Sequence, residues 1–465
     1  MWKNIDPQYR TEASKLFQLV HGFSTSSAAA KTSFYLVYLH PITLFLATIN
    51  TPSDAIKAPI QPLDTAKILR EIDLRLRSRC LGLLEIDRRG PRVQFIHKTA
   101  REFIGHPSIW GSILAQTANT GFNVNLSLLS SYILQLKSWK KGVPAGAQAP
   151  HSQLKVLWSL VHGAMHFARL TERSTRESQT TLLDQLDRAL KFHIDVIFPS
   201  VYDFSRIVLM EEGLDIQPFT PFSEMVPYKE SHWSDLIPYY AFRRCPFHTC
   251  FLSFAIQHGL LLYVQSKLAG THHQELPSKA GRPFLDYPLY VDDDRPGRDF
   301  TSTDMVETLL NHGANPNEIF NGRTPWQNVL TYLLQYGSAF GRRSGRKEIE
   351  KWGRMLELLI LHNANPNACC GEGYTMHNGV RTARRCYSAL RVVRRVFGVR
   401  GSKGSSNDHD NSSYDSGEDF QNFKIEDRKR IQFDILARLN RLLRELGGDE
   451  QEWYNSVLAY PSPNS

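Results

Sequence analysis

Two short segments in the second half of the chain repeat one another, and this constrains the fold more than any other feature. They span residues 305–317 and 355–367, so their starts are 50 residues apart. Both carry Met, Glu, Leu, His, Ala, Asn, Pro and Asn in the same order. Such self-similarity is typical of a repeat array, in which each unit buries its apolar face against the next.

Each copy has the pattern of a helix that ends in a left-handed residue and a turn. Apolar side chains recur at helical spacing in both segments. Gly313 stands where such a helix would end, and glycine adopts the left-handed conformation at little cost. In the second copy this position is Asn363, and asparagine tolerates that conformation better than most residues. The other predicted turn residues are His312, Asn315, Pro316, His362, Asn365 and Pro366.

This pattern resembles the second helix and loop of an ankyrin repeat. The Asn-Gly-Arg-Thr-Pro-Trp sequence at 321–326 resembles the start of the next ankyrin unit, although Trp326 and Gln327 replace the usual Leu-His. The spacing exceeds the ankyrin period of about 33 residues, and we place the excess in a Gly, Arg and Lys-rich insertion at 336–353. The resemblance covers residues 245–375 and implies a concave surface that binds a partner.

The first part of the chain is predicted to be helical. Apolar residues at helical spacing mark helices over 5–20, 42–49 and 65–80. Pro and Ser-rich stretches at 24–27 and 52–62 predict loops between them. Five basic residues on the third helix would suit contacts with nucleic-acid phosphates, and they would equally suit a solvated helix face. They are Lys67, Arg70, Arg75, Arg77 and Arg79.

A β-hairpin follows these helices and ends in a recognisable motif. Segments 81–86 and 93–96 flank an Arg-Arg-Gly-Pro turn and predict two strands; helices followed by such a hairpin indicate a winged helix. The sequence Phe-Ile-His-Lys-Thr-Ala-Arg-Glu-Phe-Ile at 95–104 resembles the end of the winged helix in NACHT-type signalling ATPases, the NOD-like receptors and their fungal relatives. The resemblance implies that His97 senses the phosphates of bound ADP, because imidazole can donate to a phosphate oxygen. The sequence given contains no G-x-x-x-x-G-K-[ST], so this role applies only if a NACHT domain is supplied.

The middle of the chain, residues 111–240, is predicted to be all-helical, with a Gly, Ala and Pro-rich linker at 142–150. It resembles an uncharacterised helical domain that follows the winged helix in fungal NACHT proteins. His162 and His166 share a helical face, but Gly163-Ala164 replaces the glutamate of a zinc-hydrolase helix. We therefore expect no metal site and no cofactor. The chain has 6 cysteines and no disulfide framework, which favours a reducing compartment.

The C-terminal part is strongly basic. Residues 381–400 contain seven arginines and no acidic residue, whereas the whole chain carries a net charge of +9. Interleaved apolar residues predict a basic amphipathic helix, which would meet acidic partners, a membrane surface or nucleic acid, or would cap the array with a solvated face. A Ser, Asn and Asp-rich stretch at 402–417 predicts disorder, and 425–446 predicts a last amphipathic helix. The candidate partner-binding residues are Arg384, Arg385, Arg391, Arg394 and Arg395.

These observations predict a mainly α protein: a winged helix with a small β-hairpin, a helical arm domain and ankyrin-like helical repeats. The expected divisions are residues 1–110, 111–240, 245–375 and 376–465. An unconventional unit at 249–268 would open the array. The N-terminus carries too many charges for a signal peptide, and the longest apolar run is too short to span a membrane. We therefore expect a cytoplasmic protein, with the nucleus as an alternative.

The combined pattern predicts a non-catalytic, regulatory protein-interaction module. It would be a remnant or the C-terminal portion of a NACHT-type, nonself-recognition-like signalling protein that binds a protein partner through its repeats. A second partner would be a NACHT ATPase domain in trans. Two alternatives stay open: a nucleic-acid binder that uses the winged helix and the arginine-rich helix, and a hydrolase. No Ser/His/Asp, Cys/His or paired-carboxylate set favours an enzyme.

Overall fold

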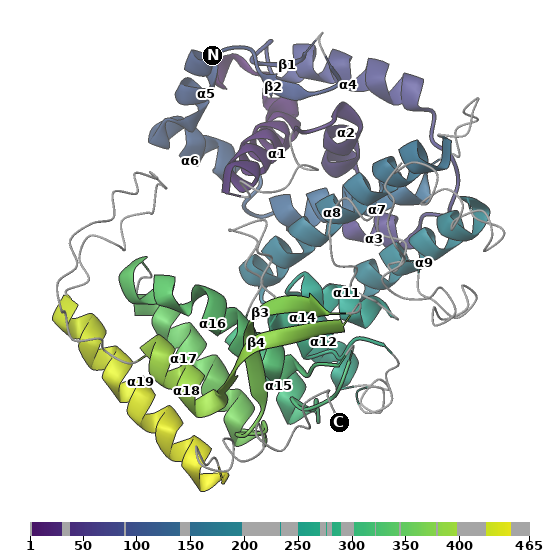
Figure 1. Ribbon diagram of the computed structural model, residues 1–465. Coiled ribbons are helices and arrows are strands. Elements are labelled where there is room, and N and C mark those ends of the chain that lie inside the picture. The colour runs from purple at the N-terminus through teal and green to yellow at the C-terminus, as the bar shows by residue number, and fades with distance from the viewer. Residues whose placement is uncertain are drawn as a thin grey trace. The chain divides into compact units, whose positions relative to one another are not determined.

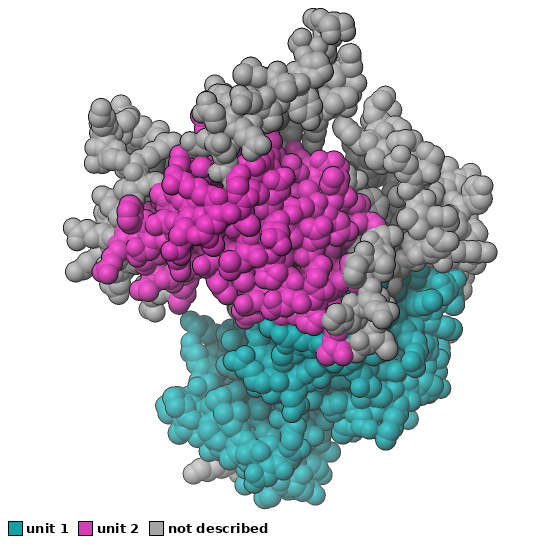
Figure 2. All heavy atoms as spheres, turned by 90° about the horizontal axis from the view of Figure 1, so that it is seen from below, with its two compact units in different colours: residues 1–267 teal, residues 268–465 magenta. Residues whose placement is uncertain are grey.

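The computed structural model divides into two compact units, residues 1–267 and 268–465, which we describe one at a time. Figure 1 shows their helices and strands, and Figure 2 colours the two units separately. In the described part of the chain, helices predominate and the strands form two antiparallel hairpins, so the protein is mainly α, as predicted. The described residues are 2–29, 38–87, 90–139, 149–197, 233, 250–269, 276, 281–289, 302–320, 322–343, 346–377, 380–397 and 425–447.

The first unit begins with helices whose caps are visible in the sequence. These elements are η1 (Trp2–Asn4), η2 (Pro7–Tyr9), α1 (Arg10–Ala29), α2 (Pro41–Ile49), α3 (Pro52–Lys57) and α4 (Thr65–Arg79). Asp6 accepts a hydrogen bond from the backbone N–H of Gln8 (3.0 Å) and so caps η2. Leu16 and Phe17 of α1 and Ile72 of α4 are fully buried, which confirms the predicted apolar faces.

One loop predicted in this region is wrong, and the other is wrong over residues 52–57 and confirmed over 58–62. Residues 24–27 belong to α1, where the hydroxyls of Ser24 and Thr25 donate to carbonyls one turn earlier (2.8 and 2.9 Å). Residues 52–57 form α3 because Thr51 and Asp54 make a capping box, in which the Asp54 carboxylate accepts from the Thr51 N–H (2.7 Å). Pro52, which suggested a loop, occupies the first position of this helix, where a missing N–H costs nothing.

The predicted β-hairpin is confirmed. Strands β1 (Leu84–Ile86) and β2 (Val93–Phe95) pair antiparallel, with Leu84 opposite Phe95. The Val93 N–H also donates to the Leu39 carbonyl (2.8 Å), which attaches the hairpin to the segment before α2. The chain continues into α5 (Lys98–Gly105) and α6 (Pro107–Ala115).

The helical arm of the first unit consists of α7 (Val124–Lys137), α8 (Ala149–Thr175) and α9 (Thr180–Ile197), as the sequence predicts. Helices α7 and α8 pack closely at Gly163, where an added Cβ would lie 2.5 Å from the ring of Tyr132. The His193 side chain of α9 contacts the Leu136 carbonyl of α7 through Nε2 (2.7 Å). Residues 140–148, which include most of the predicted linker, lie outside the described residues.

The first unit also contains a helix pair at the predicted start of the array. It consists of α11 (Phe251–Gln257) and α12 (Leu261–Leu268), joined at Gly259 with φ of +69°. The Glu172 carboxylate of α8 accepts from the backbone N–H groups of Leu262 (3.1 Å) and Tyr263 (2.8 Å), and so caps α12. Asp184 of α9 accepts from the Tyr263 hydroxyl (3.1 Å). These contacts attach the pair to the helical arm.

The second unit is built from helices in two rows. Its elements are α14 (Asp286–Leu289), α15 (Thr303–Asn311), α16 (Pro325–Arg343), α17 (Arg346–Leu361), β3 (Cys369–His377), β4 (Val380–Ser388), α18 (Ala389–Phe397) and α19 (Ile425–Glu445). One row packs in the order α14, α16, α18 and the other in the order α15, α17, α19 (Figure 1). The insertion predicted at 336–353 lengthens α16 and α17.

The helix predicted over residues 381–400 is wrong in its first half. Residues 380–388 form β4, which pairs with β3 from Cys369 opposite Ser388 to His377 opposite Val380. The pairing supplies hydrogen-bond partners for the backbone of this segment, and the sequence between the two strands is Asn-Gly. Asn-Gly is the preferred two-residue hairpin turn. The helix begins at Ala389, and the stretch predicted to be disordered, 402–417, lies outside the described residues.

Candidate functional site

The two sequence copies end in the same backbone turn. Gly313 has φ of +88° and Asn363 has φ of +64°, so both predicted left-handed positions are confirmed. In the first copy the N–H of Ala314 donates to the Leu309 carbonyl, and in the second copy that of Ala364 donates to Leu359, each at 3.0 Å. This backbone bond closes each helix with the same Schellman-type geometry.

The histidines of the two copies complete these helix ends. His312 Nδ1 lies 2.7 Å from the Thr308 carbonyl oxygen, and His362 Nδ1 lies 2.9 Å from that of Leu358. The backbone N–H of each histidine donates to the same carbonyl, at 3.2 Å in the first copy and 3.1 Å in the second, so a ring N–H there adds a second hydrogen bond to it. The two histidines therefore have an equivalent structural role in the turns.

The asparagines connect one turn to the next. Within each loop, the first asparagine of the Asn-Pro-Asn sequence accepts from the N–H of the second, at 2.8 Å in one copy and 2.9 Å in the other. Between copies, Asn317 Nδ2 donates to the Asn363 carbonyl (2.7 Å), and Asn317 Oδ1 accepts from the Asn365 N–H (2.8 Å). One amide thus bridges two turns through both its donor and its acceptor.

The bridge continues to a third turn, which the similarity of segments 305–317 and 355–367 did not reveal. Asn367 Nδ2 donates to the carbonyl of Gly447 (3.3 Å), which is the second residue after α19 and has φ of +85°. Gly447 therefore occupies the position of Gly313 and Asn363. Leu439 and Leu443, both buried, precede it at the spacing that Met355 and Leu359 have before Asn363. In the sequence this third turn is marked only by two leucines and a glycine, because it lacks the Ala-Asn-Pro-Asn that follows Gly313 and Asn363.

The residues that depart from the ankyrin pattern also join neighbouring turns. The Trp326 indole is fully buried and its Nε1–H donates to the Asn365 carbonyl (2.8 Å). Gln327 Oε1 accepts from the Thr324 N–H (3.0 Å), while its Nε2 donates to the Cys369 carbonyl (3.0 Å). Both replacements therefore supply hydrogen bonds that connect the start of α16 with the segment after α17.

The loop between the first turn and α16 presents an apolar side chain. Phe320 and Arg323 exchange two backbone hydrogen bonds, at 2.8 and 3.1 Å, which close the loop. Ile319 lies beside this closure and is 75% exposed. Binding residues are disproportionately found on loops that a rigid scaffold positions, and this loop is held in that way.

The predicted arginine site divides between two elements. Arg384 and Arg385 lie on β4, outside the residues whose side chains are described. Arg391, Arg394 and Arg395 lie on α18, whose other face is buried. Arg391 and Arg395 are exposed, and both stack near the ring of Tyr387, with guanidinium carbons 5.2 and 5.5 Å from its centroid.

His97 lies at the surface of the first unit, as the N-cap of α5. Its Nδ1 accepts from the Thr99 N–H (3.3 Å) and lies 2.9 Å from the Thr99 hydroxyl oxygen. These contacts orient the imidazole and leave Nε2 available for another group. The side chain is exposed, so a ligand from outside the unit can reach it.

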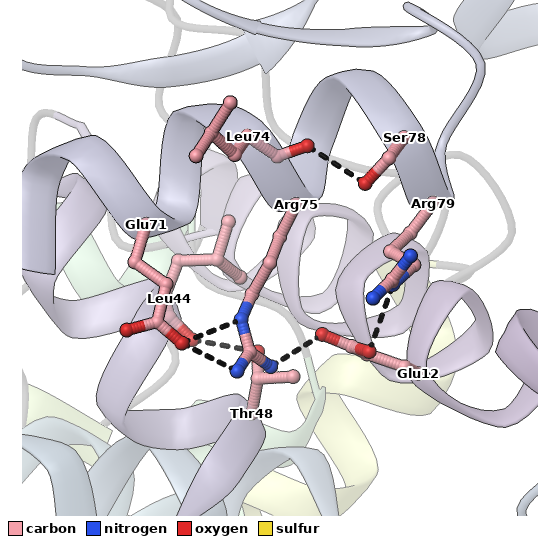
Figure 3. A network of polar contacts seen from close by, with 8 residues as sticks. All are labelled: Glu12, Leu44, Thr48, Glu71, Leu74, Arg75, Ser78 and Arg79. Atoms are coloured by element: carbon pink, nitrogen blue, oxygen red, sulfur yellow. Dashed lines mark hydrogen bonds and ion pairs between the residues drawn. The ribbon is translucent and has the colours of Figure 1, made fainter.

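Most of the basic residues on α4 are engaged in ion pairs. Arg75 contacts Glu12 of α1 and Glu71 of its own helix, each at 2.6 Å, and Arg79 contacts Glu12 at 3.3 Å (Figure 3). Arg77 pairs with an aspartate one turn earlier (2.8 Å). The contacts of Arg75 and Arg79 with Glu12 connect α4 to α1, and the ion pairs offset the charges of these two arginines and of Arg77.

The described residues include no cluster of three or more His, Cys, Asp or Glu able to hold a metal ion, and no helix among them is long and apolar enough for a bilayer. No curated protein and no solved structure matches the chain. Residues 4–145, which include His97, match a family model described as "Domain of unknown function (DUF7791)", so this part of the chain is similar to a recognised domain family to which no activity is attached.

Proposed function

We propose that the protein is a non-catalytic interaction module in which the second unit is an ankyrin-like array that binds a protein partner. The observation that carries this proposal is the series of bridged turns at Gly313, Asn363 and Gly447. Hydrogen bonds from turn to turn hold consecutive helix pairs in register, which builds an extended surface. Such a surface suits recognition of another chain better than enclosure of a small substrate.

Ile319 is the side chain we place at the centre of this interaction. It is 75% exposed on a loop whose ends are held by the Phe320–Arg323 closure and by the Asn317 bridge. Little conformational entropy is lost when a pre-organised loop binds, so an exposed isoleucine there can contribute fully to affinity.

The test is affinity capture with the full chain and two matched variants. I319S removes the exposed side chain in the second unit, and L74S removes a leucine that is 65% exposed on α4 in the first unit. We expect wild type and L74S to capture a common partner that I319S loses, with all three proteins equally stable, because exposed substitutions rarely unfold a protein. Identical captures by all three proteins would refute the proposal.

We also propose that the first unit is related to the module that follows the nucleotide domain in NACHT-type signalling proteins. The motif at 95–104 and the exposure of His97 support this relation. Here His97 would donate through Nε2 to a phosphate of ADP held by a NACHT ATPase domain in trans, and the partner bound by the repeats would alter that contact.

His106 provides a matched control for this second proposal. It is also exposed, is the N-cap residue before α6, and contacts Ser108 Oγ through Nδ1 (2.9 Å), as His97 contacts Thr99 Oγ1. We expect H97A to weaken co-elution of the full chain with an ADP-loaded fungal NACHT domain and H106A to leave it unchanged. Equal effects of the two substitutions would show that His97 has no special role.

A further inference from the structure

We infer that the exposed side of α19 binds an amphipathic helix that carries carboxylates. The outer row of the array packs in the order α15, α17, α19, and α19 is its last helix among the described residues. In a repeat array each unit packs against the next, so a helix bound beyond α19 would continue the row. This surface lies on another element than Ile319, and the inference therefore goes beyond the proposed function.

The side of α19 that faces away from α17 is identified by Ile435. A Cβ added at Gly353 of α17 would lie 2.9 Å from the Ile435 side chain, so Ile435 marks the side that packs on α17. Phe433 and Ala437, each two positions from Ile435, lie about 160° from it around the helix axis, and Arg444 lies about 180° from it. All three are exposed. They therefore lie where the next helix of the row would pack.

Five residues on this side form what we call the α19 stripe. They are Arg430, Phe433, Ala437, Arg441 and Arg444, all of them exposed. Their successive spacings of three, four, four and three residues are those of a seam along which two helices pack. Phe433 is 63% exposed and stands one turn before the small side chain of Ala437, so the stripe offers a knob beside a hole.

The arginines at the two ends of the stripe are available for a partner. Among the residues that the structure describes, Arg430 and Arg444 have no carboxylate within ion-pair distance. Earlier in the row an ion pair joins neighbouring helices, because Arg354 of α17 contacts Glu307 of α15 at 3.2 Å. Carboxylates on an added helix would pair with the arginines of α19 in the same way, and such charge-assisted contacts are among the stronger ones.

The spacing within the stripe specifies the partner. Arg430 and Arg444 are 14 residues apart, which is about 21 Å, or nearly four turns, along a helix. Phe433 and Ala437 lie between them. The matching helix therefore carries acidic residues about four turns apart and apolar residues between them on the same side.

A helix suits this surface better than a lipid layer or nucleic acid does. Asp434 and Glu445 are also exposed on α19, and Glu445 lies 3.9 Å from Arg441. These carboxylates would repel the closely spaced phosphates of a membrane surface or a duplex, on whose attraction such binding depends. A helix avoids this repulsion because it places individual carboxylates opposite individual arginines.

Fluorescence anisotropy with the full chain tests the inference. The probe is a labelled 21-residue peptide of three heptads, with Leu at positions a and d, Glu at e and g, and Ala elsewhere. A second labelled peptide carries Lys in place of Glu, and a labelled 20-base-pair duplex represents nucleic acid. We expect the wild-type chain to bind the acidic peptide and to bind the other two probes much more weakly.

Two matched pairs of variants locate the binding surface. R444E and R438E make the same change of charge on two exposed arginines of α19, but Arg438 lies about 120° around the helix from Arg444. F433S and L74S remove apolar side chains that are 63% and 65% exposed. We expect R444E and F433S each to weaken peptide binding at least about tenfold, and R438E and L74S to leave it within about threefold of wild type.

Thermal melts followed by circular dichroism check that the variants keep the fold. If R444E melts below wild type, the comparison of F433S with L74S decides alone. Equal weakening within a pair of correctly folded variants would overturn the inference, as would failure of the acidic peptide to bind wild type or tighter binding of the basic peptide or the duplex. If the inference fails in this way while I319S still loses the captured partner, the proposed function stands.

Discussion

The bridge at Asn317 allows a quantitative test of how the array is held together. N317A removes the donor to the Asn363 carbonyl (2.7 Å) and the acceptor for the Asn365 N–H (2.8 Å). A hydrogen bond contributes roughly 0.5–1.5 kcal/mol net. Since both bonds lie at the surface, water replaces part of what is lost, and we expect the free energy of unfolding to fall by about 1–2 kcal/mol.

Two measurements check this expectation. Urea denaturation of the full chain followed by circular dichroism gives the loss of stability, with the transition of the second unit as the readout. Amide hydrogen exchange gives the local effect, because the N–H of Asn365 loses its acceptor in N317A and should exchange faster than in wild type.

Asn311 provides the control, since it is an exposed asparagine near the end of α15. N311A should be neutral or slightly stabilising, because alanine has the higher helix propensity. Equal stability of N317A and N311A, together with unchanged exchange at Asn365, would refute the idea that the turn bridges stabilise the array.

Three further predictions concern the first unit. G163A should destabilise it by about 1–2 kcal/mol in urea denaturation, because the new Cβ would lie 2.5 Å from the Tyr132 ring. The energy of this steric clash outweighs the roughly 1 kcal/mol by which alanine is favoured over glycine in a helix. Unchanged stability would contradict the close packing of α7 and α8. K137M should lower the unfolding midpoint, with a loss of about 1–3 kcal/mol, because the buried Lys137 Nζ donates to the carbonyls of Ala55, Ile56 and Ala58 that end α3; a midpoint equal to wild type would exclude this capping role. Burial raises the pKa of Glu172 to about 7, although its two backbone N–H donors act in the opposite direction. Between about pH 4.5 and pH 7 the folded state therefore binds more protons than the unfolded state, and the free energy of unfolding falls as the pH rises through this window. E172Q should lack this component, so the difference in unfolding free energy between wild type and E172Q should change across that pH window and stay flat above it; a constant difference would contradict the assignment.

Local rules made the turns predictable. A helix that needs a left-handed end selects Gly or Asn, and residues 313 and 363 carry those two types in equivalent places. The hairpin before His97 was predictable for the same reason, because its strands and turn are contiguous in the chain. The β3–β4 hairpin was also local, but the seven arginines interleaved with apolar residues over 381–400 favoured a helix, whereas the Asn-Gly dipeptide before them indicates a hairpin turn.

Contacts between distant residues were beyond sequence reasoning. The third turn depends on Asn367 and Gly447, which are 80 positions apart, and nothing in either residue type identifies the other as its partner. The sequence favoured a basic face on α4, whereas Glu12, more than sixty positions earlier, pairs with Arg75 and Arg79. The stacking of Arg391 and Arg395 on Tyr387 likewise follows from the junction of a strand with a helix at Ser388 and Ala389, which the predicted continuous helix did not contain.

The most direct test of partner binding by the array places a photo-crosslinking amino acid at position 319 of the full chain. The same amino acid at position 74, which is also strongly exposed, serves as the comparison. The proposed function predicts that irradiation in extracts of the native source gives a discrete adduct with one protein from position 319 and none from position 74. Adducts from position 74 alone, or the same adducts from both positions, would contradict binding through the repeats.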